Sequence, residues 1–85
     1  MRTYRKDPDE KISIGFDWSE REAIASSSWE IDAGLDAENG TYGDDYADII
    51  VFGGTADEQY KCTNTVTTTE GLIYQRSVMV QVVTR

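Results

Sequence analysis

Residues 59–84 read QYKCTNTVTTTEGLIYQRSVMVQVVT, two long segments rich in Thr and Val that meet at Glu70-Gly71. β-Branched residues favour strands, and a break containing glycine between two such segments favours a hairpin. We therefore expect an antiparallel pair of strands over Gln59–Thr69 and Leu72–Thr84. They are the longest strands that the sequence predicts, so they should form the centre of the sheet.

Side-chain alternation predicts which face of each strand is buried, because successive residues point to opposite sides. The inward set of the first strand is Tyr60, Cys62, Asn64 and Val66, and that of the second is Tyr74, Val78, Val80 and Val82. Tyr60 follows Gly54-Thr55, as in the tyrosine corner of immunoglobulin-like domains, where the hydroxyl bonds back to the backbone. The alternative is a plain core aromatic.

Four shorter strands are expected upstream, over residues 12–16, 25–31, 35–38 and 46–52. Asn39-Gly40 is the commonest hairpin dipeptide, and Gly43-Asp44-Asp45 is a second turn signal. No segment predicts a long helix. Closely spaced short strands of this kind indicate an all-β fold, a small immunoglobulin- or fibronectin-III-like antiparallel sandwich of about six to seven strands.

The N-terminus lacks this pattern. Nothing before Ile12 alternates, and Pro8 restricts Asp7 to extended conformations. We expect an extended arm over residues 1–10 and a single sandwich domain over residues 11–85. The predicted core residues are Phe16, Trp29, Ile49, Val51, Tyr60, Cys62, Val78 and Val80. Trp29 is expected at the centre, between the two sheets.

The segment Tyr46–Phe52 is apolar on both faces, although a sandwich strand normally turns one face to solvent. Tyr46, Ile50 and Phe52 would then form an exposed strip, which is typical of an interaction surface. The alternative is that the loop Thr41–Asp45 or the N-terminal arm covers them. The predicted partner-interface residues are Arg2, Tyr4, Arg5, Lys6, Tyr46, Ile50 and Phe52.

Composition excludes several classes of function. The 85 residues include 16 acidic and 8 basic side chains, a net charge of −8 that disfavours a nucleic-acid partner. There is no histidine, hence no Ser-His-Asp triad and no imidazole zinc site. No apolar run is long enough to cross a membrane. We expect no enzyme activity, no catalytic residue and no cofactor.

Metal binding and cysteine chemistry receive little support. Five carboxylates lie in or near turns, but their spacing matches no EF-hand loop, so no metal site is predicted. They are Asp32, Asp36, Glu38, Asp44 and Asp45. The single cysteine, Cys62, reads as a small core residue, with a reactive thiol or an intermolecular disulfide as alternatives.

The charges are unevenly distributed along the chain. Between Asp17 and Glu58 there are 12 carboxylates and one basic residue, Arg21, whereas Arg2, Arg5, Lys6 and Lys11 crowd the N-terminus. A basic arm and an acidic body favour head-to-tail contact between copies, and such contacts close into rings when the rotation permits.

A series of short motifs, in order along nearly the whole chain, resembles small tailed-phage proteins of the fibre–tail adaptor family. The motifs are Lys6-Asp7-Pro8-Asp9, Phe16-Asp17-Trp18-Ser19, Ile24–Trp29, Gly34-Leu35, Gly53-Gly54-Thr55-Ala56, Tyr60, Thr63–Thr68 and Arg76-Ser77. Two departures are Cys62, where a β-branched residue is expected, and the charged loop Glu20-Arg21-Glu22.

The resemblance implies a non-enzymatic virion protein, assembled in the host cytoplasm. It would act in many copies as an adaptor joining tail or neck to fibre components. Its partners would be tail, neck, portal-proximal or fibre proteins and copies of itself in a symmetric ring, with neither nucleic acid nor membrane. One alternative is a capsid decoration protein of the same fold. Another is a carbohydrate-binding module that stacks sugars on exposed Trp18 and Tyr42.

Overall fold

The computed structural model describes residues 2–84, and Met1 and Arg85, the ends of the predicted arm and domain, lie outside the described residues. These residues form strands and turns only, so no membrane-spanning helix occurs among them. The strands are β1 (Arg2–Lys6), β2 (Ile12–Asp17), β3 (Ile24–Ile31), β4 (Leu35–Tyr42), β5 (Tyr46–Gly53), β6 (Gln59–Thr68) and β7 (Ile73–Val82).

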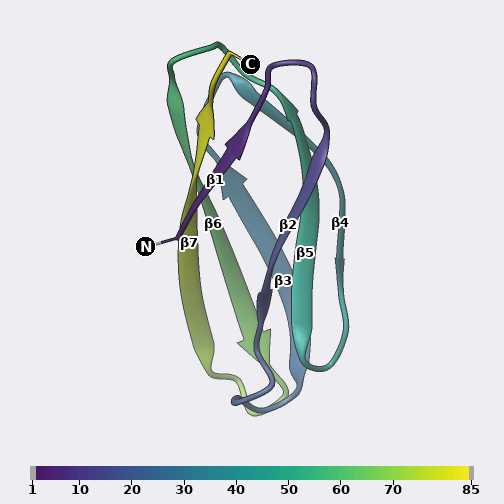
Figure 1. Ribbon diagram of the computed structural model, residues 1–85. Helices are drawn as coiled ribbons and strands as arrows, with labels where there is room; N and C mark the ends of the chain where they lie inside the picture. Colours follow the sequence, from purple (N-terminus) through teal and green to yellow (C-terminus); the bar gives the residue numbers. More distant parts are fainter. Residues whose placement is uncertain (1, 85) are drawn as a thin grey trace.

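The strands form two sheets that pack face to face, which confirms the prediction of an all-β sandwich (Figure 1). One sheet has the order β1-β7-β6-β3 and the other the order β2-β5-β4. All neighbouring strands are antiparallel except β1 and β7, which run parallel. β6 and β7 form the expected hairpin in the middle of the larger sheet.

The core lies between the sheets and follows the alternation of β5, β6 and β7. Both sheets contribute to its main cluster, which consists of Ile14, Leu35, Ile49, Val51, Tyr60, Cys62, Val78, Val80 and Val82. Phe16 and Trp29 pack against this cluster while remaining half-buried. Trp29 therefore lies toward the edge of the sandwich rather than at its centre, with its ring stacked on Phe16 at a centroid distance of 5.8 Å.

The N-terminal residues are part of the larger sheet and do not form the expected free arm. Arg2 to Lys6 pair in parallel with Val78 to Val82 along the whole of β1. The side chain of Lys6 is completely buried, and its Nζ donates to the carbonyl oxygens of Gly53 (2.6 Å) and Asp7 (2.7 Å). Sequence alternation missed β1 because its inward positions carry Arg, Tyr and Lys instead of aliphatic residues.

The predicted hairpin turn at Asn39-Gly40 is wrong. β4 continues through it to Tyr42, and the pairing with β5 shifts between Glu38 and Thr41. Asn39 adopts a φ of 56°, which fits an extra residue accommodated in a β-bulge. The hairpin turn lies instead at Gly43-Asp44-Asp45, where the Gly43 N–H donates to the Tyr46 carbonyl.

A buried amide joins three parts of the sandwich. Asn64 on β6 is completely buried, and its Oδ1 accepts a 3.0 Å hydrogen bond from Nε1 of Trp18, just after β2. Its Nδ2 donates to Ser27 Oγ and to the Ser28 carbonyl on β3, each at 2.9 Å. Trp18 is only 1% exposed and packs with Ile24, Ala47 and Val66 in a second core cluster.

Tyr60 forms the tyrosine corner. Its hydroxyl accepts a 2.9 Å hydrogen bond from the Thr55 N–H, five residues upstream. Gly54 lies in this corner with a φ of 87°, and a Cβ there would come within 2.7 Å of Val82. The corner requires glycine both for its backbone conformation and for the close approach of β7.

We predict that Lys6→Met lowers the free energy of unfolding by about 1–3 kcal/mol, because two carbonyls lose their charged donor. Urea denaturation of the purified chain measures the change. Lys61→Met, at an exposed position on β6, is the matched control and should leave stability within about 0.5 kcal/mol. Equal effects of the two substitutions would contradict an anchoring role for Lys6.

We predict that Asn64→Leu costs about 2–4 kcal/mol, because the Trp18 Nε1 and the Ser28 carbonyl would remain buried without partners. Thermal unfolding measures the loss, and Gln59→Leu at an exposed position on the same strand is the control. A melting temperature unchanged by Asn64→Leu would show that the amide does not hold the sheets together.

Candidate functional site

The outer face of the β2-β5-β4 sheet carries the strip singled out in β5. Ala47 and Val51 are completely buried, so Tyr46, Ile50 and Phe52 point away from the core. Tyr46 is 46% exposed, whereas Ile50 and Phe52 are half-buried. The paired strands add polar neighbours and one glycine to this face, which are Ser13, Gly15 and Asp17 from β2 and Asp36, Glu38 and Thr41 from β4.

A surface ion pair partly covers the strip. Lys11 Nζ lies 4.9 Å from the centroid of the Phe52 ring and 2.7 Å from Glu38 Oε1. The side chains of this pair are 55% and 38% exposed, and such pairs contribute only about 0–1 kcal/mol. The N-terminal strand does not provide the cover, because β1 belongs to the other sheet. A partner can therefore displace the cover without unfolding any part of the chain.

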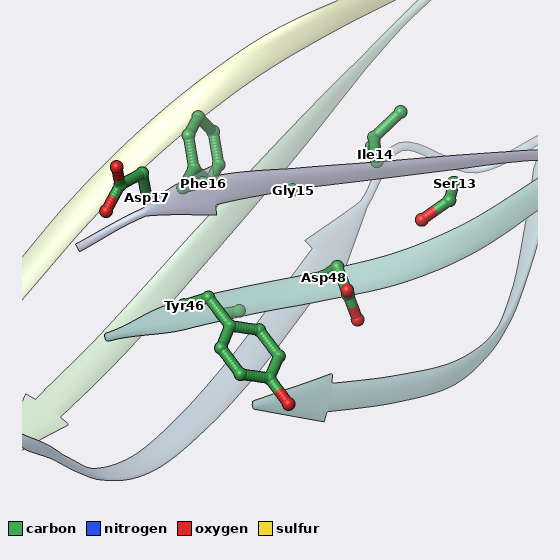
Figure 2. A pocket seen from close by; sticks show the side chains of 8 residues that line it. Ser13, Ile14, Gly15, Phe16, Asp17, Tyr46 and Asp48 are labelled. Atoms are coloured by element: carbon green, nitrogen blue, oxygen red, sulfur yellow. The ribbon is translucent and has the colours of Figure 1, made fainter. Parts of the chain in front are cut away.

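A shallow depression of about 270 Å³ opens beside Tyr46, between β2 and β5 (Figure 2). Tyr46 and Asp48 leave β5 on one side of the sheet, while Ile14 and Phe16 leave β2 on the other (Figure 2). Gly15 lines the depression, and β5 approaches it so closely that a Cβ there would lie 2.7 Å from both the Ala47 carbonyl oxygen and the Asp48 Cβ. The close approach of β5 therefore requires a residue without a side chain at this position.

The depression has an acidic rim. Asp48 accepts a hydrogen bond from the Thr41 hydroxyl. Asp17 ends β2, and hydrogen bonds from the Ser19 side chain and backbone N–H, together with the nearby charge of Arg76, lower the pKa of its carboxyl group. Among residues 2–84 no group of three or more His, Cys, Asp or Glu side chains is arranged to hold a metal ion. The site offers aromatic surface and negative charge, which suit a protein partner.

The predicted interface residues do not form one surface. Tyr46, Ile50 and Phe52 lie together, but β1 is in the opposite sheet. Lys6 is buried, so its assignment to the interface is wrong. Tyr4 packs against the main core, and Arg2 lies over its ring at 5.0 Å.

Trp18 is not the exposed sugar platform that one alternative required. It is buried, with Arg76 stacked 4.3 Å from its ring centroid and paired with Glu20. Tyr42 is 45% exposed, but its hydroxyl donates to the Ala25 carbonyl and fastens β4 to β3. The predicted pair of stacking rings is therefore absent.

Comparison with known proteins identifies the family. Residues 6–81 match the sequence model described as podophage GP4 fiber-tail adaptor protein gp77. The chain belongs to this family. A search of curated proteins gave no match.

Membership in the fiber-tail adaptor family gives the chain a structural adaptor role in the virion of a podophage. It also confirms the resemblance recognised from the ordered motifs. The match begins at Lys6, the buried residue that anchors β1, and ends at Gln81 in β7. The family match therefore spans almost the entire sandwich.

Cys62 is closed to intermolecular chemistry in the folded chain. It is completely buried, and burial, with a smaller contribution from the charge of Asp32, raises the pKa of its thiol to about 11. A disulfide to a neighbour would require the core to open. The reactive-thiol alternative conflicts with the same two observations.

We predict that Cys62 reacts far more slowly in the folded chain than in urea with a thiol reagent that releases a coloured product, measured by absorbance at pH 8. Rapid labelling under native conditions would contradict the buried assignment.

The raised pKa of Cys62 also predicts that its contribution to the free energy of unfolding is constant below pH 9.0 and is lost between pH 9.0 and about 11. The sign follows because the unfolded thiol ionises first as the pH rises.

Proposed function

We propose that this chain joins tail components to one another through the outer face of the β2-β5-β4 sheet. The observation that carries the proposal is the position of Tyr46, exposed beside Ile50 and Phe52 on a sheet face where alternation would place polar residues. Removing such a strip from water favours association by about 25 cal/mol per Å² of apolar area. The chain acts through contact and catalyses no reaction.

The partners are a neighbouring tail, neck, portal-proximal or fibre protein and further copies of this chain. Support for contact between copies comes from the different character of the two outer faces. Arg5 and Lys61 are exposed on the outer side of the larger sheet beside one carboxylate, Glu30. The outer face of the smaller sheet carries Asp36, Glu38 and Asp48, with Lys11 as its cation. Opposed faces of this kind favour a head-to-tail arrangement that closes into a ring, and many copies strengthen weak single contacts.

This arrangement replaces the basic arm with the outer side of the larger sheet, where Arg5 and Lys61 are exposed. Lys6 takes no part because it is buried. Assembly takes place in the host cytoplasm, where the folded chain is added to the growing particle. The adaptor family also favours a tail position over the capsid surface that a decoration protein would occupy.

We predict that the double variant Tyr46→Ser/Ile50→Ser remains folded but is not incorporated into particles. Phage carrying this variant would be purified, and the amount of the chain per particle measured by quantitative mass spectrometry. The matched control is Leu72→Ser/Ile73→Ser, which removes two exposed apolar residues (47% and 66% exposed) at the opposite sheet's hairpin.

The control variant should be incorporated normally. Thermal unfolding of both purified variants checks that the fold is retained. Normal incorporation of the Tyr46/Ile50 variant would refute the proposed interface.

A further inference from the structure

The four outermost strands of the sandwich, β1 to β4, differ in how well their free edges are protected. β1 carries the exposed charged side chains of Arg2 and Arg5, which discourage strand addition. β4 carries the bulge between Glu38 and Thr41, and β3 carries a register shift between Ile24 and Ser26. The Tyr42 hydroxyl also occupies the Ala25 carbonyl of β3. Bulges and side-chain contacts of this kind prevent a further strand from adding to an edge.

β2 lacks these protections. Its six residues pair with β5 in one continuous register, from Ile12 opposite Val51 to Asp17 opposite Tyr46. It contains neither proline nor lysine. Within residues 2–84, β5 is the only strand paired with it. At its end, the Asp17 carbonyl accepts a 3.0 Å hydrogen bond from Arg76, so the open edge consists of Ile12 to Phe16.

The side chains of this edge leave room for a close neighbour. Gly15 has none, and Ser13 is small and exposed. On the inward side, Ile12 and Phe16 remain half-buried although both pack against the main core. An added strand would complete the burial of these two side chains, which an isolated sandwich leaves unfinished.

We propose that the free edge of β2 binds an extended segment of a partner protein, which adds to the β2-β5-β4 sheet as a fourth strand. This inference rests on the proposed adaptor function and specifies how one contact is made. The backbone N–H and C=O groups that alternate along the edge would supply the hydrogen bonds.

The chemistry of the edge defines the occupant. Alternate side chains of the added segment would face the core beside Ile12 and Phe16 and are therefore apolar. The others would lie on the outer face near Asp17 and Asp48, and are therefore basic or neutral. A second copy of this chain fits poorly, because the net charge of −8 and the Asp17 at the end of its own β2 would be brought against like charges. The occupant is a different protein with apolar residues alternating with Lys, Arg or Thr.

Hydrogen exchange in the assembled particle tests the proposal directly. The purified chain and particles containing it would each be exposed to D₂O, and peptides covering residues 12–17 compared by mass spectrometry. The amides that face the free edge should exchange at least about tenfold more slowly in the particle. Peptides from β3, which has a protected edge, serve as the internal control.

A pair of matched variants tests the same point by incorporation. Ser13→Lys places a long charged side chain on the edge of β2, and Ser26→Lys makes the same change at an exposed position on the edge of β3. Ser13→Lys should reduce the chain retained per particle about tenfold and return the exchange of residues 12–17 in the retained copies to the rate of the isolated chain, and Ser26→Lys should do neither. Because Ser13 also lies opposite Ile50 on the outer face, the exchange rate is the measurement that reports on the edge itself.

The possible outcomes separate this inference from the adaptor function. If particles contain the chain, but residues 12–17 exchange as fast as in the isolated protein, the edge contact is refuted and the adaptor function stands. If the chain is missing from particles of the unmodified phage, the adaptor function itself fails. Slowed exchange that Ser13→Lys does not affect would place the protection elsewhere and would also refute the strand addition.

Discussion

The hydrogen bond between Trp18 and Asn64 connects the two sheets of the sandwich at the end of β2. Trp18 follows β2 in the smaller sheet, while Asn64 lies on β6 in the larger one, so this contact joins the two layers through the core. The same amide is bonded to β3 and therefore also fixes the edge of the larger sheet. Because every polar atom of the amide has a partner, it can be buried without the cost of unpaired polar groups.

Aromatic packing around Trp18 extends this constraint to the candidate site. Phe16 lies 6.1 Å from Trp18, between ring centroids, and stacks on Trp29, so the end of β2 is held between two large rings. Gly15 precedes Phe16 and lines the depression beside Tyr46. The shape of the outer surface is thus determined by packing on the opposite side of the same strand. Tyr46, Ile50 and Phe52 are held in place by the paired strand β5.

The sequence predicted the structure correctly where apolar residues alternate along a strand or where a motif has one known geometry. The alternation in β5, β6 and β7 predicted their buried faces, and Tyr60 predicted its own backbone contact. It failed where polar side chains occupy inward positions. Lys6 is buried by bonding to carbonyls, a partnership between residues distant in the chain that no local pattern reveals. Asn39-Gly40 satisfies the preferences of both a turn and a bulge, and only the pairing with β5 distinguishes them. Likewise, the position of Trp18 in a predicted loop did not indicate that its Nε1 would donate a hydrogen bond to Asn64.

The parallel pairing of β1 with β7 has a consequence for synthesis. It joins β1 to β7, with Arg2 opposite Val78, so the larger sheet cannot be completed until β7 has been synthesised. Until then β1 has no strand to pair with. Folding must wait for contacts between the most distant parts of the sequence, which is intrinsically slow. A chain that ends before β7 would therefore leave β1 without its neighbouring strand.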